Sequence, residues 1–256
     1  MLYGYGILNN HVPTLKATVM RGSGSIAPPS SLLTGLYAVY KAESNANDSL
    51  GTYNGTAQGG LTYTAGKSGN AFTFNGTTAY VRLPDSFKLS DSGSNAFSIS
   101  LWGYLTNTGQ AAGLLTNFMQ NDPSTQLHGW MLWHYGEKIR FNRCDGTSTS
   151  ASALDTGTTL IAMNSWHHIV VTRKNGSTKI YVDNVLRASD TSTTSIVYTT
   201  THKPLIGARN SYNPDYFDWL SGNNTKIDEV NVWTKELTST EITELYNAGT
   251  GKFYPY

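Results

Sequence analysis

The segment 226–249 constrains the fold most, because it is typical of one strand followed directly by one short, capped helix. In residues 227–233, apolar side chains recur at alternate positions, as in a strand that buries one of its faces. Thr238 stands three residues before Glu241, which is the spacing of a capping box at a helix N-terminus. Gly249 then supplies a left-handed stop. Since almost everything upstream indicates strands and turns, we expect a β protein that closes on a single helix.

The remainder of the chain carries closely spaced segments of strand period, separated by turn signals. The clearest hairpin joins residues 166–172 to residues 178–182 through Lys174-Asn-Gly-Ser177. Further strands are expected at residues 36–41, 71–74, 79–83, 97–104 (with Phe97, Ile99 and Leu101 facing inward), 130–133 and 138–141. No helical pattern is interleaved with them. The fold class is therefore predicted to be all-β, an antiparallel two-sheet jelly-roll sandwich.

Composition excludes several classes of protein. The 256 residues carry 18 Lys and Arg against 17 Asp and Glu, a net charge of +1, whereas nucleic-acid binding usually needs a basic excess. The single Cys144 rules out an internal disulfide. No apolar run is long enough to cross a membrane, and residues 1–12 do not resemble a signal peptide. We therefore expect no nucleic-acid partner and no membrane insertion, with synthesis in the cytoplasm and release by another route.

The first 34 residues differ from the rest. Short apolar stretches lead into the segment 21–31, whose Gly, Ser and paired Pro are typical of a linker. We divide the chain into an N-terminal arm and linker, residues 1–34, and a jelly-roll domain, residues 35–256. The arm either docks on another protein or folds back on the domain as an edge strand.

The order of several motifs resembles the concanavalin A-like, laminin-G-like (LamG) jelly-roll family. The motifs are Gly35-Leu-Tyr-Ala-Val-Tyr40 with Asn45-Ala-Asn-Asp-Ser49, residues 65–76 with Ala79-Tyr-Val81, residues 166–172 with 179–183, Leu205-Ile-Gly207, and residues 227–249. The resemblance runs from about Gly35 to Gly251, and it is specific for the fold rather than for a ligand. It implies a concanavalin A-like sandwich with a short C-terminal helix.

Two acidic residues are candidates for a structural Ca²⁺ site. Asp48 lies in an Asn-rich loop, and Asp228 begins the strand face that carries Val230 and Val232. A carboxylate on an apolar face must be paired or bound to a cation, and calcium takes oxygen ligands of the kind that such a loop offers. The resemblance implies a structural calcium near these two segments. The alternative is that both carboxylates accept backbone N–H bonds in turns.

Aromatic residues beside amides and carboxylates predict a carbohydrate site, because sugars stack on aromatic rings while polar groups bind their hydroxyls. One cluster lies in the loop 209–224 and the other at the tip of the hairpin that contains residues 130–135. The candidate residues are Asn210, Tyr212, Tyr216, Asp218, Trp219, Trp133 and His134. Two alternatives remain: Trp130 or Trp133 fills the sandwich core, and the loop aromatics contact a neighbouring subunit.

Catalysis is not expected. The enzymes that share the resembled architecture carry two glutamates and an aspartate that alternate on one strand, and no Glu-x-Asp-x-x-Glu occurs in this chain. Neither a Gly-x-Ser-x-Gly motif nor a phosphate-binding loop occurs.

Two functions fit these observations. The first is a phage virion component, such as a capsid decoration, head fibre or tail appendage, which assembles through residues 1–34 on other virion proteins. Such a protein would be a homo-oligomer that displays the jelly roll to host surface glycans. The alternative is a stand-alone lectin module at an extracellular surface, and a polysaccharide-cleaving enzyme is the weaker third possibility.

Overall fold

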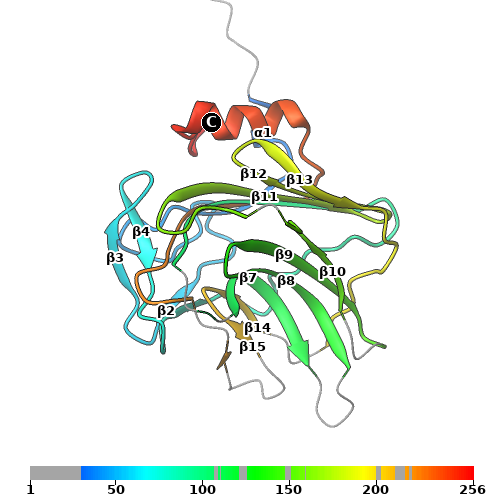
Figure 1. Ribbon diagram of the computed structural model, residues 1–256, viewed down its shortest axis with the longest axis horizontal. Helices are drawn as coiled ribbons and strands as arrows, with labels where there is room; N and C mark the ends of the chain where they lie inside the picture. Colours follow the sequence, from blue (N-terminus) through cyan, green and yellow to red (C-terminus); the bar gives the residue numbers. More distant parts are fainter. Residues whose placement is uncertain are drawn as a thin grey trace, which may run out of the picture.

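Two antiparallel sheets pack face to face, and one short helix lies on the outside of one of them (Figure 1). The computed structural model describes residues 30–106, 109, 111–120, 126–147, 151–158, 160–199, 203–210, 217–218 and 221–256. This architecture confirms the predicted jelly-roll sandwich with a C-terminal helix.

Sheet A has eight strands. Seven of them follow one another in the order β13 (Val185–Asp190), β12 (Ser177–Val182), β11 (Trp166–Lys174), β6 (Ala96–Tyr104), β17 (Lys226–Trp233), β4 (Asn70–Thr73) and β3 (Thr62–Ala65). The eighth strand, β1 (Leu36–Tyr40), also pairs with β17.

Sheet B has seven strands, in the order β10 (Ser152–Asp155), β9 (Lys138–Asp145), β8 (Leu127–Tyr135), β7 (Ala111–Gln120), β14 (Lys203–Ile206), β5 (Tyr80–Arg82) and β2 (Thr56–Gln58). A separate pair is formed by β15 (Arg209–Asn210) and β16 (Phe217–Asp218).

The main core lies between the sheets and is built from the inward side chains of both. Phe97, Ile99 and Leu101 of β6 belong to it, as their alternation predicted. Trp130 of β8 is also fully buried there, and its Nε1 donates to the Tyr198 hydroxyl at 2.7 Å. The expectation that a tryptophan of this hairpin fills the sandwich core is therefore met by Trp130.

Strand β17 carries a β-bulge that changes which side chains share a face. Its register on β6 shifts just after Asp228, and Glu229 has a left-handed φ of +47°. The extra residue brings Ile227 onto the same core face as Val230 and Val232. Asp228, next to Ile227, points to the other face. The prediction that Asp228 shares the face of Val230 and Val232 is therefore wrong, because strict alternation ends at the bulge.

Helix α1 (Ser239–Tyr246) packs on the outer face of sheet A. The Thr238 hydroxyl accepts the Glu241 N–H at 3.2 Å, and the Glu241 carboxylate accepts the Thr238 N–H at 2.9 Å. These two bonds confirm the predicted capping box. The helix ends at Asn247, whose φ is +46°, two residues before the predicted stop at Gly249. Asparagine tolerates the left-handed conformation, which explains the earlier end. The 3₁₀ turn η2 (Asn247–Gly249) follows.

Residues just before β1 are part of the packed domain. The 3₁₀ turn η1 (Ser31–Leu33) places the fully buried Leu32 in a second cluster with α1. Trp233 Nε1 donates to the Leu32 carbonyl at 2.7 Å. The domain boundary drawn after residue 34 therefore falls a few residues too late, and residues 1–29 of the arm lie outside the described residues.

Two buried arginines join the sheets at one side of the sandwich. Arg173 of β11 pairs with Asp91 at 2.7 Å, and Arg143 of β9 pairs with Asp190 at 2.6 Å. Both guanidinium groups also donate to the hydroxyl of Thr178, at 3.1 and 2.8 Å. Because β9 belongs to sheet B and β11 to sheet A, this network ties the two layers together.

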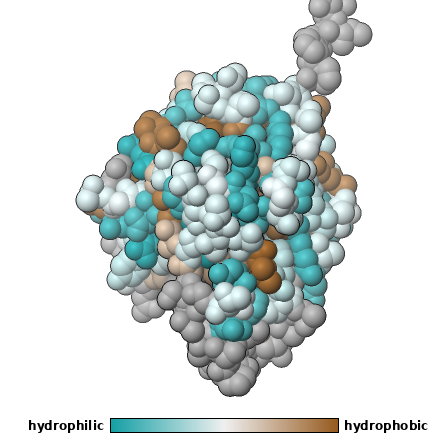
Figure 2. Space-filling model, turned by 90° about the vertical axis from the view of Figure 1, so that its right-hand side faces the viewer, coloured by the Kyte–Doolittle hydropathy of each residue, from teal (hydrophilic) through white to brown (hydrophobic). Residues whose placement is uncertain are grey.

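The side of the molecule with the edge strands β10 and β13 faces the viewer in Figure 2. Its described surface is mostly hydrophilic and carries small, separate apolar patches (Figure 2). Such a surface is typical of sheet edges that do not pair with another chain. None of the helices in the described part of the chain has both the length and the apolar character that crossing a membrane requires.

Candidate functional site

The described flanks of the predicted aromatic loop lie on the outer face of sheet B, beside strand β7. The segment that leads into β15 crosses over β7, where the Thr116 hydroxyl donates to the Ala208 carbonyl at 2.9 Å. On the other side of the 209–220 segment, the Ser221 hydroxyl donates to the Gly113 carbonyl at 2.8 Å. Gly113 lies directly across from Trp133 of β8. Both ends of the loop that carries β15 and β16 are thus fixed beside the predicted hairpin residues.

The approach of this segment to β7 requires a glycine. A Cβ atom on Gly113 would lie 2.4 Å from the Ala208 carbonyl oxygen, which is closer than real contacts allow. The β-bulge that follows Gly113 in β7 occurs at the same place. The base of the loop is therefore set by backbone packing.

A cross-strand row extends from this point over three strands of sheet B. Trp133 of β8 lies across from Arg140 of β9, and Arg140 lies across from Asp155 of β10. Arg140 donates from Nε at 3.1 Å and from Nη2 at 2.8 Å to the same Asp155 oxygen. The Arg140 guanidinium carbon lies 5.1 Å from the centre of the Trp133 ring. The row thus presents a hydrogen-bonded ion pair over a buried aromatic ring.

The structure describes the side chains of three predicted carbohydrate residues, Trp133, His134 and Asn210, and buries all three. Trp133 is 5% exposed and donates from Nε1 to Asn142 at 3.0 Å, so its ring is no open platform for a sugar. His134 is fully buried, and burial lowers its pKa. Asn210 is buried in β15. Asp218 is described only as part of the backbone of β16, and Tyr212, Tyr216 and Trp219 lie outside the described residues.

Three residues that are not among the predicted site residues lie on the outer side of the same sheet: Tyr135, which belongs to the predicted hairpin cluster, and Arg140 and Asp155, which the sequence analysis missed. The Tyr135 side chain is 51% exposed on the face of Trp133, two residues along β8. Arg140 and Asp155 are half-buried beside it. Alternation along the hairpin marks Tyr135 and Arg140 as outward-facing, and this signal was available in the sequence. The pairing of Arg140 with Asp155 was not, because it depends on the register of β9 and β10.

The side chain of Asp48 does not fit a calcium site. One of its oxygens accepts the N–H groups of Val39 at 2.9 Å and Leu50 at 3.0 Å, and the other accepts those of Thr52 at 3.1 Å and Tyr53 at 3.0 Å. A carboxylate oxygen accepts about two such bonds, so hydrogen atoms occupy the positions that a cation would need. The geometry matches the alternative that Asp48 organises a turn.

Asp228 is also engaged by backbone amides, with one oxygen accepting the N–H groups of Lys67 at 2.8 Å and Ser68 at 3.0 Å. Burial raises the pKa of Asp228 to about 7, and burial and Asp228 together raise that of Glu229 to about 8. Within the described ranges no three His, Cys, Asp or Glu side chains are grouped to hold a metal. Calcium stays a prediction, and a melting scan with and without chelator tests it, since a folded-state ligand raises the midpoint.

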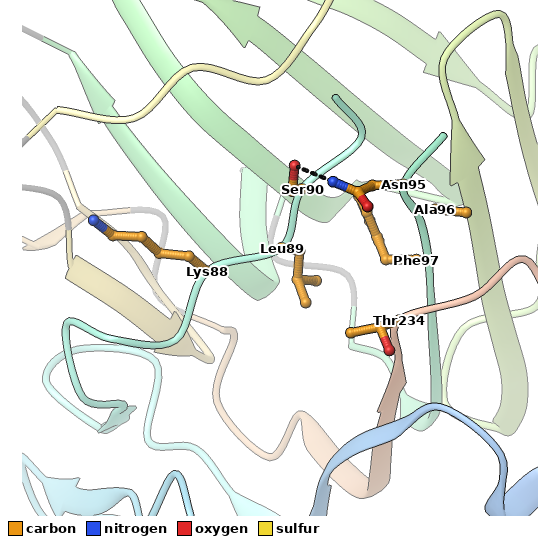
Figure 3. A pocket seen from close by; sticks show the side chains of 7 residues that line it. All are labelled: Lys88, Leu89, Ser90, Asn95, Ala96, Phe97 and Thr234. Carbon is orange, nitrogen blue, oxygen red and sulfur yellow. Dashed lines mark hydrogen bonds between the residues drawn. The ribbon is translucent and has the colours of Figure 1, made fainter. Parts of the chain in front are cut away.

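A separate cavity of about 240 Å³ lies where β6 begins and β17 ends (Figure 3). Leu89, Ala96 and Phe97 form its apolar lining, together with Lys88, Ser90, Asn95 and Thr234. The Asn95 amide donates to the Ser90 hydroxyl at 3.3 Å, and the Lys88 side chain points away from the others (Figure 3). None of the predicted site residues lines this cavity.

One group of side chains has the order of a catalytic triad. The Ser165 hydroxyl lies 2.9 Å from His167 Nε2, and His167 Nδ1 lies 2.7 Å from Asp183. His167 Nε2, however, is also 2.8 Å from the Ala162 carbonyl, to which the Ser165 hydroxyl donates at 3.1 Å. A general base needs a free nitrogen to take the serine proton, whereas here an acceptor faces each ring nitrogen. The geometry is that of a charged histidine holding a loop.

Comparison with known families and structures agrees with this architecture. The Laminin_G_3 family model, described as the concanavalin A-like lectin/glucanases superfamily, matches residues 75–243. No curated protein sequence matches the chain at a significant level.

Several solved structures share the fold at low sequence identity. Domain 4 of AbnA, a GH43 extracellular arabinanase from Geobacillus stearothermophilus solved with arabinotriose, is 22% identical with a TM-score of 0.63, over 85% of this chain and 98% of that one. The binding domain of Paraclostridial Mosquitocidal Protein 1 is 17% identical with a TM-score of 0.65, over 85% of this chain and 53% of that one. The botulinum neurotoxin serotype D binding domain is 16% identical with a TM-score of 0.63, over 83% and 51%.

The chain therefore spans about half the length of these two toxin binding domains, and at such identities the likeness shows the fold alone. The family match covers more than half of the sequence and includes the hairpin of β11 and β12 and most of the closing segment. The resemblance found in the sequence is thereby confirmed, and the protein belongs to the concanavalin A-like lectin/glucanases superfamily.

Proposed function

We propose that this protein is a non-enzymatic carbohydrate-binding module whose site is the outer face of sheet B, between the β15–β16 strand pair and strands β8 to β10. The observation that carries the proposal is the convergence on one face of an anchored loop, an exposed tyrosine ring and a half-buried Arg140–Asp155 pair. An aromatic ring beside paired donors and acceptors is the chemistry that sugar recognition needs.

The compared structures support this class of ligand. The AbnA domain was solved in complex with arabinotriose, and one botulinum neurotoxin binding domain was solved in complex with SialylT. The compared proteins are mostly binding domains rather than catalytic ones, which favours recognition without catalysis.

Binding to a glycan array, followed by calorimetry on the best ligand, tests the proposal. Tyr135→Ala and Trp219→Ala should each weaken binding, since both residues belong to the proposed face or its loop. Asn95→Ala, in the cavity at the ends of β6 and β17, is the matched control and should leave affinity unchanged. An array on which the unaltered protein binds nothing would refute the carbohydrate function. Loss of binding in Asn95→Ala alone would move the site to the cavity.

We further propose that the module is displayed on a virion, attached through its N-terminal arm. The segment from Ser30 to Leu33 packs with α1 on the outer face of sheet A, whereas the proposed site lies on the outer face of sheet B. Ser30, the first residue that the structure describes, therefore lies on the side of the domain opposite the proposed glycan face, which suits attachment of a displayed binding module from that side. Attachment to other virion proteins and assembly into a homo-oligomer belong to the same proposal.

Size measurement in solution tests the arm. We compare the full chain with a variant that begins at Ser30, which keeps the buried Leu32 and leaves the domain intact. The full chain should form the larger assembly. Equal assembly states would remove the arm as an assembly device, and co-purification with virion particles provides an independent measure of attachment.

A further inference from the structure

We propose that Arg140 and Asp155 bind two adjacent free hydroxyl groups of a neutral saccharide, whose C–H face rests on the Tyr135 ring. The inference rests on the proposed carbohydrate function and names the class of sugar that this face takes. It follows from the way in which the three side chains are held.

Arg140 is fixed before any ligand arrives. Its Nε and Nη2 atoms donate to Asp155 at 3.1 and 2.8 Å, and its guanidinium carbon lies over the buried Trp133 ring, 5.1 Å from the ring centre. Trp133 is itself held by its 3.0 Å bond to Asn142. Nη1 makes no hydrogen bond to any described residue, so its N–H groups remain for a ligand. A preorganised guanidinium loses little side-chain entropy on binding.

Asp155 supplies the acceptor. One oxygen receives the two Arg140 bonds, and the other accepts the Gly157 N–H at 2.7 Å, which leaves that second oxygen room for one more hydrogen. Burial alone would raise the Asp155 pKa, but the Gly157 N–H and Arg140 hold it below its usual value. The carboxylate is therefore ionised, and the pair as a whole is electrically neutral.

This arrangement favours a neutral ligand over an acidic one. A pair of adjacent hydroxyls gives one hydrogen to Asp155 while an oxygen accepts from Arg140, so every polar group finds a partner. The carboxylate of a uronic acid, by contrast, would have to approach Arg140 against the charge of Asp155. Lys138, which lies across from Tyr135, is the neighbouring cation that an acidic sugar would use instead.

Tyr135 completes the site. Its ring is exposed, whereas the neighbouring Trp133 ring is buried. It stands on the Trp133 face of β8, diagonal to Arg140, and diagonal neighbours in an antiparallel pair lie about 7–8 Å apart. A pyranose or furanose ring that spans this distance places its hydroxyls on the ion pair and its C–H face on the tyrosine.

Calorimetric titration of the full chain tests the inference with three ligand sets. They are neutral oligosaccharides with free adjacent hydroxyls, the same sugars with those hydroxyls O-methylated, and uronic acid oligosaccharides. Neutral sugars should bind, and methylation should abolish binding. Arg140→Lys and Asp155→Asn should each weaken affinity by about tenfold to a hundredfold, the usual effect of losing a hydrogen bond to a charged group.

Lys138→Gln is the matched control and should leave affinity for neutral sugars unchanged. Thermal melts of each variant establish that the domain remains folded. Preference for uronic acids with dependence on Lys138, or unchanged affinity in folded Arg140→Lys and Asp155→Asn, would overturn the inference and leave the carbohydrate function standing. Absence of binding to every sugar, by contrast, would refute both.

Discussion

Asp48 shows how one side chain can hold a loop. Its four hydrogen bonds reach from β1, through Val39, to the following turn, through Leu50, Thr52 and Tyr53. The side chain is 3% exposed, so these amides would have few alternative partners without it. The loop that the resemblance associated with calcium is thus organised by the protein's own amides.

Replacing Asp48 with alanine should therefore destabilise the domain strongly. The Val39 N–H would lose its acceptor in a buried setting, and the other three N–H groups would lose theirs in a partly buried one. Loss of a buried acceptor costs about 1–3 kcal/mol before the loop relaxes. We expect a decrease of about 3 kcal/mol or more in the free energy of unfolding, measured by urea denaturation. Asp85→Ala, at an exposed carboxylate, is the control and should change the midpoint little. Equal effects of the two changes would contradict this role.

Two adjacent histidines should respond to pH in opposite directions. The hydrogen bond to Asp183 raises the pKa of His167, so its contribution to stability is complete below an unfolded value of about 6.5 and is lost as pH rises through the folded value. Burial lowers the pKa of His168 to about 4, so its contribution is lost as pH falls from about 6.5 toward that value.

Urea titrations at several pH values should separate these two effects. His167→Gln should cost more stability at about pH 5 than at about pH 8, because only the charged ring satisfies both Asp183 and the Ala162 carbonyl. His168→Gln should reduce the loss of stability on acidification. The same pH dependence in both variants would contradict the assignment of a charged His167 and a neutral His168 in the folded protein.

The closing helix and the turn η1 behave as one packed unit. Leu32, Trp233, Leu237, Ile242 and Leu245 form a cluster outside sheet A that is separate from the main core. Although η1 has only three residues, it completes this cluster and supplies the acceptor for Trp233 Nε1. The folded domain therefore begins at η1, because this turn packs against the C-terminal helix α1.

Truncation should reveal this dependence. A variant that begins at Gly35 lacks Leu32, and loss of a buried leucine side chain costs about 2–5 kcal/mol. We expect it to melt at a lower temperature than a variant that begins at Ser30, while the Ser30 variant melts like the full chain. Matching melting temperatures for the two truncated forms would show that η1 is dispensable.

Local chemistry explains which elements could be predicted. The capping box of Thr238 and Glu241 and the Asn-Gly turn between β11 and β12 depend on neighbours in sequence, and both were found. The bulge at Glu229 was not, because its left-handed backbone is imposed by pairing with β6 and leaves no mark in the residue pattern.

The candidate site was predicted less well than the fold. Aromatic composition drew attention to Trp133 and His134, yet both are buried, since composition does not indicate which rings the strands cover. The ligand-facing pair of Arg140 and Asp155 arises from the alignment of three strands. Such pairing is a property of register, which is set by the whole sheet.

At the scale of the whole molecule, the buried arginine network is a polar link between the two layers, in addition to the apolar core. Arg173 and Asp91 are both 1% exposed or less, and Arg143 joins them through Thr178. Burying charges is unfavourable unless they are paired, so each member depends on the others.

Asp91→Asn should consequently cost about 3–5 kcal/mol, because it leaves the charge of Arg173 buried without its carboxylate. Replacing both residues together, as Asp91→Leu with Arg173→Met, should recover much of that loss. A double-mutant cycle measured by urea unfolding gives the coupling between them. Additive effects would mean that the two side chains do not act as a pair.

Gly113 has a consequence for how this molecule can change over time. It lets the backbone at Ala208 rest directly against β7, and Thr116 and Ser221 fasten the two sides of the crossing. In the sequence, residues 211–216 fall between these two contacts, and neither contact is made by them. Natural variants of this protein should accordingly differ most in residues 211–216 and keep glycine at position 113. New ligand specificities could then evolve while sheet B stays the same.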